Sequence, residues 1–377
     1  MVAKRLRVAV LFGGQSVEHD VSVVSARAIM NALDPEKYEA VPVAITREGR
    51  WLPPPVAKGL LEQSPDRKGG PGPADHSASG IAPIDVPALA VSQTEGVDFG
   101  RFDVVFPVVH GTQGEDGTVQ GLLELAGLPY VGGGVLASAV GMDKATMKSV
   151  FRDAGLPVAC FLVIRKHDWQ AGVHQITARV GPEVGYPCFV KPSNGGSSVG
   201  VAKVPNEGGF RVAVDKALQL DRKVIVEEAI PGRELECSVL GNDDPIASTV
   251  GEIVPKREFY DYEAKYHDDR TELLIPAPIP HDVAKSLRGL ALEAFRALDC
   301  SGMARVDFFL RTVDNKLFVN EINTIPGFTQ VSMYPKLWEA SGIGYRDLVD
   351  RLVQLALERH RESQQTRERY AEIRPGA

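Results

Sequence analysis

Continuous apolar runs, each closed by glycine or proline, divide the first part of the chain into alternating strands and helices. Residues 8–12 form an apolar run that two glycines end, which predicts a buried strand of a parallel sheet. Residues 22–33 then show helical spacing up to an Asp-Pro pair, and residues 39–46 form a second apolar run. This strand–helix–strand order predicts an α/β lobe at the start of the chain.

The rest of the chain repeats these two patterns. Strands are expected at residues 102–109, 158–164, 187–191, 200–204, 224–228, 234–240, 246–253, 304–310 and 317–322. Helices are expected at residues 118–126, 138–154, 210–220, 283–298 and 345–361. From residue 362 onward the chain is charged and carries few apolar side chains, so we expect a frayed tail over residues 364–377.

One segment departs from both patterns. Residues 53–96 contain three successive prolines, a Gly/Pro cluster at 69–73 and few long apolar runs. This composition predicts an exposed, mobile insertion, for which a passive loop is the simplest interpretation. Three successive glycines at 132–134 mark a domain boundary near residues 132–140.

Length, charge and cysteine content exclude several classes of protein. The 377 residues suffice for two or three domains, each with its own core. With 42 basic and 49 acidic residues, the formal charge of −7 disfavours general binding to nucleic acid or to a membrane surface. The four cysteines are far apart, which fits a reducing compartment and disfavours a zinc site. The first apolar run is too short to span a membrane, so we expect a cytoplasmic protein without membrane insertion.

A glycine- and serine-rich loop lies between two apolar runs at residues 189–203. Lys191 ends the first run, and the loop that follows includes Ser197 and Ser198. Glycines let backbone N–H groups approach an anion, and hydroxyl groups and a lysine add donors, so the segment is typical of a phosphate-binding loop. An ordinary glycine hairpin is the alternative, and the loop alone does not decide between the two.

The same loop matches the G-x-S-x-G motif of serine hydrolases, with Ser198 in the place of the nucleophile. That motif requires a strand before the serine and a helix after it. The residues that follow Ser198 alternate like a strand, so the context disfavours this interpretation.

Two predicted strands near the end of the chain carry polar residues at alternate positions. Arg305 and Asp307 lie two apart, as do Glu321 and Asn323, and residues two apart share a face of a strand. Two carboxylates and an amide oxygen on one sheet face suit Mg²⁺, which proteins often share with nucleotide phosphates. A solvated face with an Arg–carboxylate pair is the alternative. The strongly apolar flanking residues favour the metal.

Three loops add candidate residues. Glu18 and His110 each follow a predicted strand, where open α/β sheets bind their ligands. Residues 259–267 are aromatic and charged without clear periodicity, which is typical of a lid that excludes water from a site. An irregular surface loop is the simpler interpretation of this last segment when it is taken alone.

Taken in order, these segments resemble the D-alanine–D-alanine ligases of the ATP-grasp superfamily, and the resemblance covers nearly the whole chain. The matching segments are residues 11–22, 110–121, 141–144, 190–198, 260–266, 305–307, 320–329 and 332–335. The family implies a three-lobed α/β fold with α+β character in its C-terminal part. Its lobes would be an N-terminal doubly wound parallel-sheet lobe (1–138), a central lobe with the phosphate loop (139–231) and a C-terminal lobe (232–363) with a lid at 256–273.

The resemblance also implies an activity. Such an enzyme joins two D-alanine molecules to D-alanyl-D-alanine for peptidoglycan precursors, and converts ATP to ADP and phosphate through a D-alanyl phosphate. It uses two Mg²⁺ ions per site, with Mn²⁺ as a substitute. Family analogy further implies a homodimer and no nucleic-acid partner.

Site residues follow from the same resemblance, position by position. The implied catalytic residues are Glu18, His110, Ser197, Lys265, Tyr266 and Arg305. The implied ATP-binding residues are Lys144, Lys191, Ser197, Ser198, Glu227, Glu228, Ile230, Glu234, Lys265 and Asn320. The implied D-alanine-binding residues are Glu18, His110, Arg305, Gly327, Ser332 and Met333, and the implied metal ligands are Asp307, Glu321 and Asn323.

Within this set the resemblance gives several residues distinct tasks. Glu18 would bind the ammonium group of the first D-alanine, and its hydrogen bonds with Ser197 and Tyr266 would latch the lid. Lys265 would reach the γ-phosphate when the lid closes, and Arg305 would stabilise the developing oxyanion. Some relatives carry leucine at the position of Met333, which is a mild exchange in a packed pocket.

Three alternatives remain at this point. The chain could be another ATP-grasp ligase with a different acceptor, which shares the nucleotide site. It could be a serine hydrolase built on Ser198. It could also be a nucleotide-binding module without activity, although the intact set of Arg305, Asp307, Glu321 and Asn323 argues against this.

Overall fold

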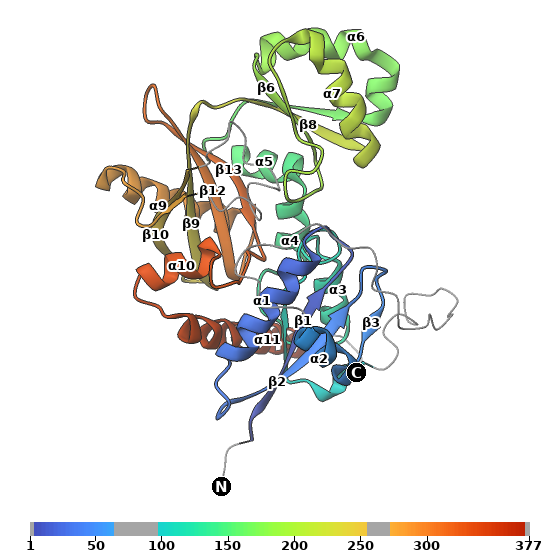
Figure 1. Cartoon of the computed structure of the whole chain (residues 1–377), viewed down its shortest axis with the longest axis vertical. Coiled ribbons are helices and arrows are strands. Elements are labelled where there is room, and N and C mark those ends of the chain that lie inside the picture. The colour runs from blue at the N-terminus through green and yellow to red at the C-terminus, as the bar shows by residue number, and fades with distance from the viewer. Residues whose placement is uncertain (1–3, 64–96, 255–271, 374–377) are drawn as a thin grey trace.

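The structure is a computed structural model that describes residues 4–63, 97–254 and 272–373, and three sheets form the centres of its lobes (Figure 1). The first sheet has the order β3-β2-β1-β4, in which β1, β2 and β4 are parallel and β3 is antiparallel to β2. Its strands are β1 (Leu6–Gly13), β2 (Tyr38–Ile45), β3 (Trp51–Leu52) and β4 (Val104–Pro107). Helices α1 (His19–Ala32), α2 (Pro54–Gln63) and α3 (Thr118–Leu125), and the short 3₁₀ helix η2 (Phe99–Arg101), complete this N-terminal lobe. Strand β1 is buried along most of its length, as its unbroken apolar sequence predicts.

The central lobe is a four-stranded antiparallel sheet in the order β5-β8-β6-β7. Its strands are β5 (Phe161–Arg165), β6 (Cys188–Pro192), β7 (Ala202–Val204) and β8 (Lys223–Glu228). Helices α6 (Lys166–Glu183) and α7 (Glu207–Leu220) pack on the sheet and enclose a hydrophobic cluster with Trp169, Phe210 and Val214 at its centre. In this sheet β6 and β7 are neighbours, so the glycine-rich loop connects two antiparallel strands.

The C-terminal lobe is a five-stranded antiparallel sheet in the order β11-β10-β9-β12-β13. Its strands are β9 (Gly232–Gly241), β10 (Ile246–Val254), β11 (Glu272–Leu274), β12 (Gly302–Arg311) and β13 (Leu317–Asn323). Helices α9 (His281–Ala297) and α10 (Met333–Ala340) pack on this sheet. Helices α4 (Val135–Met142) and α5 (Lys144–Asp153) lead from the first lobe to the central lobe, as Figure 1 shows.

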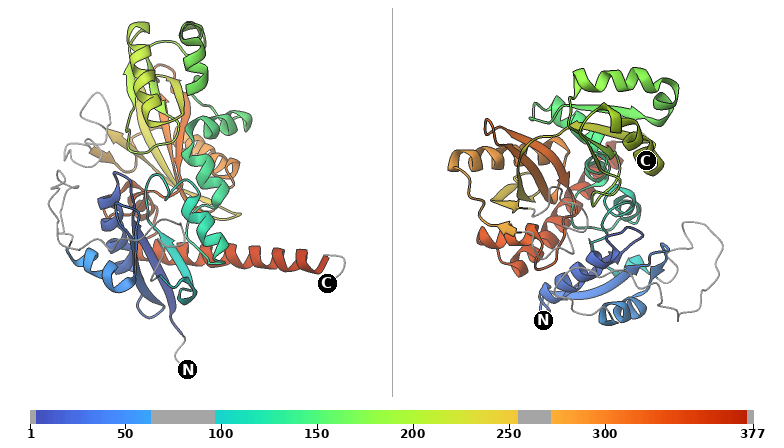
Figure 2. Two further views of the ribbon diagram at one scale, coloured as in Figure 1. Left: turned by 90° about the vertical axis from the view of Figure 1, so that its right-hand side faces the viewer. Right: turned by 45° about the horizontal axis from the view of Figure 1, so that its top comes forward.

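A long final helix, α11 (Tyr345–Ile373), connects the N- and C-terminal lobes. Its buried residues Leu348 and Leu352 belong to the same hydrophobic cluster as Val10 of β1 and Leu240 of β9. The helix therefore contributes to the core between the two lobes, whereas its last turns run out past the other elements (Figure 2).

Most predicted elements are present, and the mixed helix-and-sheet class is confirmed, but two predictions about helices are wrong. The helix expected at residues 138–154 is two helices, because Asp143 stops α4 and caps α5 by accepting a hydrogen bond from the Thr146 N–H group at 2.9 Å. The tail expected to be frayed continues as α11 to Ile373. Its charged side chains are good helix formers, and Arg367 pairs with Glu124 of α3 at 2.9 Å.

Other elements were not predicted. Residues 53–96 were expected to form an exposed loop, but Pro54–Gln63 form helix α2. Residues 64–96 lie outside the described residues. Helix α6 buries only two residues along its length, so its apolar spacing is weak. Helix α10 is eight residues long, and β3 and β11 are shorter still.

Candidate active site

The loop after β1 is fixed by one glycine and one serine. Gly13 has a left-handed backbone with φ of 92°, and a Cβ atom there would lie 2.1 Å from the carbonyl oxygen of Ile45, so only glycine fits. Ser22 of α1 donates a hydrogen bond to the carbonyl oxygen of Val108 at 2.5 Å and accepts one from the Gly13 N–H group at 2.7 Å. These bonds join the loops after β1 and β4 and place Glu18, at the start of α1, at the carboxyl end of the sheet.

His110 follows β4 and lies in a buried pair with Glu115. The His110 Nδ1 atom is 3.1 Å from the carbonyl oxygen of Ile325 and 3.8 Å from Oε1 of Glu115, whose Oε2 atom accepts a hydrogen bond from Gly111 at 2.6 Å. Burial by itself would lower the pKa of His110, but Glu115 and Glu18 outweigh it and raise that pKa. Burial raises the pKa of Glu115 in turn. Burial and the neighbouring charges therefore both shift this pair, and a proton is bound there at higher pH than on the isolated groups.

The glycine-rich loop reaches from the central lobe to the N-terminal lobe. The hydroxyl group of Ser197 donates a hydrogen bond to Oε1 of Glu18 at 2.5 Å, as the sequence resemblance implied. Ser197 and Ser198 both have left-handed backbones, with φ of 51° and 58°. Lys144 donates a hydrogen bond from Nζ to the carbonyl oxygen of Gly195 at 2.8 Å. The loop thus lies between Glu18 and Lys144.

Lys191, which precedes this loop, belongs to a cluster of three charged side chains with little exposure to solvent. Glu227 of β8 lies 2.9 Å from Nζ of Lys148 and 2.5 Å from Nζ of Lys191, and only 3% of Glu227 is exposed. Burial would raise the pKa of Glu227, but the two lysines outweigh it and lower that pKa to about 2. Burial also lowers the pKa of Lys148, whereas Glu227 raises the pKa of Lys191 against the effect of burial. The cluster therefore presents positive charge beside the loop.

Strands β12 and β13 bring together the polar residues that the sequence placed on one face. Arg305 pairs with Asn323, and Asp307 pairs with Glu321, in the antiparallel register. Arg305 donates hydrogen bonds from Nε and Nη2 to the two carboxylate oxygens of Asp307, each at 2.7 Å, and its Nε atom lies 3.1 Å from Oε2 of Glu236 on β9. Burial would lower the pKa of Arg305, but Asp307 and Glu236 hold it well above its usual range. The guanidinium group is permanently charged and fixed on two sides.

The oxygen atoms beside Arg305 are of the hard kind that divalent cations prefer, and both oxygens of Asp307 also accept hydrogen bonds from Arg305. Asp307 and Glu321 supply carboxylates on adjacent strands, and Asn323 supplies an amide oxygen that accepts a hydrogen bond from Ile325 at 3.0 Å. Lys144 lies 3.4 Å from Oε2 of Glu321, which connects the phosphate-loop side to these oxygens. Within the described ranges no group of three His, Cys, Asp or Glu side chains forms a complete ligand set, so phosphate oxygens would have to complete the coordination.

The segment after β13 carries the remaining predicted substrate residues. The Thr329 N–H group donates a hydrogen bond to the hydroxyl oxygen of Ser332 at 3.1 Å, which closes a turn before α10. Gly327 faces Ser332, because a Cβ atom at Gly327 would lie 3.0 Å from Oγ of Ser332. Met333 is buried at the start of α10 beside Gly251, where a Cβ atom would lie 2.8 Å from the methionine sulfur.

Four predicted ATP-binding residues line the junction of the central and C-terminal lobes. Glu228 ends β8, and its N–H group bonds to the carbonyl oxygen of Cys160 at 2.9 Å. Ile230 lies between β8 and β9, and Glu234 lies on β9 beside β12. Asn320 is the extra residue where β13 bulges against β12.

Two predicted site residues, Lys265 and Tyr266, lie in the segment 255–271, which is outside the described residues. Three buried partners, Glu115, Lys148 and Glu236, were not predicted from the sequence. Glu236 lies two residues after Glu234 on one strand, which is the same alternation that singled out Arg305 and Asp307. The sequence gives a weaker indication of Lys148 and Glu115, because Lys148 is a single charged residue in a helix and Glu115 is a single charged residue in a loop.

Family models match both halves of the chain. The model of the D-Ala–D-Ala ligase N-terminus matches residues 7–133, and the model of the D-Ala–D-Ala ligase C-terminus matches residues 150–354. A D-alanine–D-alanine ligase of Geobacillus thermodenitrificans is 50% identical over 363 residues, which cover 96% of this chain and 98% of the relative. One of Acetivibrio thermocellus is 47% identical over 365 residues, with 95% and 97% coverage.

Solved structures agree with these matches. The D-alanine–D-alanine ligase of Coxiella burnetii is 39% identical, with a TM-score of 0.79 and coverage of 98% of this chain and 99% of that one. The VanG D-Ala:D-Ser ligase of Enterococcus faecalis is 34% identical, with a TM-score of 0.77 and coverage of 94% and 100%. No helix among the described residues is both long and apolar enough to cross a membrane. The expected ATP-grasp fold is confirmed, and the chain belongs to the D-alanine–D-alanine ligase family.

Proposed function

We propose that the protein joins two D-alanine molecules to D-alanyl-D-alanine, converts ATP to ADP and phosphate, and supplies the dipeptide for peptidoglycan precursors. The observation that carries this proposal is the hydrogen bond between Ser197 and Glu18. It joins a phosphate-type loop of the central lobe to a carboxylate of the N-terminal lobe that suits an ammonium group. A nucleotide and an amino acid would therefore meet at one point.

In the first step, a carboxylate oxygen of the first D-alanine attacks the γ-phosphorus of ATP, and ADP leaves. Both reactants are anionic, so the approach needs fixed positive charge. Lys144 and Lys191 supply it from the loop side, and the buried pair with Glu227 keeps Lys191 charged. Glu18 binds the ammonium group of the first D-alanine and orients its carboxylate.

In the second step, the amine of the second D-alanine attacks the carbonyl carbon of D-alanyl phosphate, and phosphate leaves from the tetrahedral intermediate. Arg305 is held in place by Asp307 and Glu236 and donates to the oxyanion that develops. A fixed donor of this kind contributes about 3–4 kcal/mol to a transition state. Ser332 and Met333 hold the carboxylate of this second substrate, and Gly327 is a further residue of the D-alanine-binding set.

Divalent metal ions suit the donor set of Asp307, Glu321 and Asn323. Two Mg²⁺ ions, or Mn²⁺ in their place, would be held there and would offset the charge of the phosphate oxygens when ATP is bound. His110 lies beside the first substrate. Lys265 and Tyr266 would close the site from the lid, since water would hydrolyse the acyl phosphate. Relatives that make D-alanyl-D-lactate carry a different residue at the position of Tyr266, so this tyrosine favours an amine as the second nucleophile.

The alternatives are less well supported. The residues after Ser198 lead into β7 and not into a helix, so the strand–turn–helix context of a serine hydrolase is absent around that serine. A ligase with another acceptor shares the nucleotide site, and one structural relative is a D-Ala:D-Ser ligase. The greater identity to D-alanine–D-alanine ligases favours D-alanine as the acceptor.

The test is phosphate release from ATP with a panel of D- and L-amino acids, together with identification of the product. We expect release with D-alanine and formation of D-alanyl-D-alanine. Release that does not respond to D-alanine would contradict the proposal. A cytoplasmic homodimer is the expected form by family analogy, and light scattering of the purified protein measures its oligomeric state.

A further inference from the structure

Phe328 is held through both of its backbone polar groups by two different lobes. Its N–H group donates a hydrogen bond to the hydroxyl oxygen of Ser25 on α1 at 3.2 Å. Its carbonyl oxygen accepts a hydrogen bond from the hydroxyl group of Tyr345, the first residue of α11. The segment on either side of Phe328 carries Gly327, a residue of the D-alanine-binding set, and Ser332, which we assign to the second D-alanine.

The side chain of Phe328 is fixed as firmly as its backbone. It is fully buried, and its ring centroid lies 5.7 Å from that of Phe106 on β4, 5.4 Å from that of Tyr334 on α10 and 5.9 Å from that of Tyr345. These edge and tilted contacts are favourable aromatic geometries. The phenylalanine thus joins the N-terminal lobe to the C-terminal elements.

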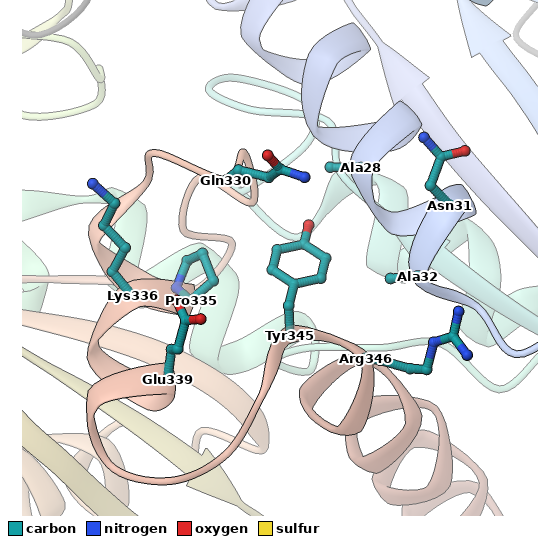
Figure 3. A pocket seen from close by; sticks show the side chains of 9 residues that line it. All are labelled: Ala28, Asn31, Ala32, Gln330, Pro335, Lys336, Glu339, Tyr345 and Arg346. Atoms are coloured by element: carbon teal, nitrogen blue, oxygen red, sulfur yellow. The ribbon is translucent and has the colours of Figure 1, made fainter.

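Packing alone does not fix Tyr345 itself. One side of it borders a cavity of about 430 Å³, which is also lined by Ala28 and Ala32 of α1 and by Gln330. Figure 3 shows the tyrosine ring between the start of α11 and α1, with Gln330 on the loop beside it. Burial raises the pKa of Tyr345, so the hydroxyl group stays protonated and can donate. Because open space adjoins one side of the ring, the hydroxyl bond to Phe328 links the start of α11 to the loop in addition to the ring contacts.

We propose that Tyr345 is a positioning residue for the acceptor D-alanine, because its hydroxyl group holds the segment that carries Gly327 and Ser332. This inference rests on the proposed function and adds a specificity-determining residue outside the substrate contacts. Glu18 and the phosphate loop, which we assign to the first D-alanine and to ATP, lie on other segments, so we expect this bond to affect the acceptor most.

The test compares Tyr345→Phe with Tyr38→Phe. Tyr38 is the control, because its hydroxyl group connects α11 to the N-terminal lobe and not to the segment of Phe328. This hydroxyl group donates a hydrogen bond to Asp350 at 2.7 Å and accepts one from Gln354 at 2.9 Å. We expect Tyr345→Phe to raise the KM of the acceptor D-alanine by about three- to tenfold, the factor that corresponds to one lost hydrogen bond. The KM values of ATP and of the first D-alanine should stay unchanged, and Tyr38→Phe should leave all three unchanged.

A second variant, Ser25→Ala, removes the other hydrogen bond of Phe328 and should raise the same KM. Tyr345→Phe loses the hydrogen bond to Phe328, and Tyr38→Phe loses two. A decrease in Tm that is at least as large in Tyr38→Phe, with a change of acceptor KM only in Tyr345→Phe, would separate positioning from stability. If the wild-type enzyme is active and both Tyr345→Phe and Ser25→Ala have its acceptor KM, this inference is wrong and the proposed function stands. A wild-type enzyme that makes no D-alanyl-D-alanine would overturn the proposed function and the inference with it.

Discussion

The two sides of the site each contain a buried glutamate, and the pKa values of these two glutamates are shifted in opposite directions. On the nucleotide side, Glu227 lies between Lys148 and Lys191, and the lysines lower its pKa to about 2. On the amino-acid side, the buried side chains of His110 and Glu115 lie 3.8 Å apart, and the pKa of each is raised. Two lysines outweigh the effect of burial at Glu227, whereas burial outweighs the effect of one histidine at Glu115. The difference shows that the number of nearby cations decides which form of a buried carboxylate is favoured.

The largest expected effect follows from Glu227→Gln. This substitution leaves two buried lysines without their carboxylate, which typically destabilises a fold by about 3–5 kcal/mol. The folded-state pKa is below the usual value, so this stabilisation is present above the unfolded pKa and is lost as the pH falls toward 2. Urea unfolding at neutral pH measures the change.

A matched control for this variant is Glu183→Gln. Glu183 pairs with Arg179 at 2.6 Å on the exposed surface of α6, where ion pairs contribute little. An unchanged midpoint is expected for this variant. If Glu227→Gln were as stable as Glu183→Gln, the description of the nucleotide side as a fixed ionic cluster would be wrong.

Arg305→Ala tests the junction between the two sides. We expect kcat to fall by about two to three orders of magnitude, because the fixed guanidinium group acts on charge that develops in the transition state. ATP affinity should change far less, since Lys144 and Lys191 bind the phosphates. Steady-state kinetics and nucleotide-binding titrations give the two values, and equal losses in both would count against the oxyanion role.

The amino-acid side predicts a smaller effect, which depends on pH. The raised pKa of His110 gives stability below its unfolded pKa that is lost as the pH rises through the folded value. The raised pKa of Glu115 acts in the same direction, because its ionisation favours the unfolded chain. Urea midpoints should therefore fall as the pH rises above the unfolded pKa values of the two groups, and Glu115→Gln should reduce or reverse that trend.

The control for this pH series is His167→Gln. The side chain of His167 is 93% exposed, so its removal should leave the pH dependence of the wild type intact. Parallel curves for wild type and Glu115→Gln would show that the buried pair does not titrate as the structure indicates.

Local patterns predicted the parts of the site that lie on single strands and loops. The alternation of Arg305 with Asp307, and the glycines after Lys191, are visible in a few consecutive residues. Glu236 was missed because its role depends on the pairing of β9 with β12, strands about seventy residues apart in the chain. The break at Asp143 was missed for a similar reason, since Lys223 and Ser193 hold its carboxylate from the central lobe.

Transfer of a labelled oxygen tests the central claim most directly. D-alanine carrying ¹⁸O in its carboxylate would be incubated with ATP and the protein, and the phosphate released would be analysed by mass spectrometry. Attack of the carboxylate on the γ-phosphorus, followed by displacement by the second amine, leaves one labelled oxygen in each phosphate formed together with D-alanyl-D-alanine. Dipeptide accompanied by unlabelled phosphate would contradict the acyl-phosphate route, and with it the meeting of nucleotide and amino acid at Glu18 and Ser197.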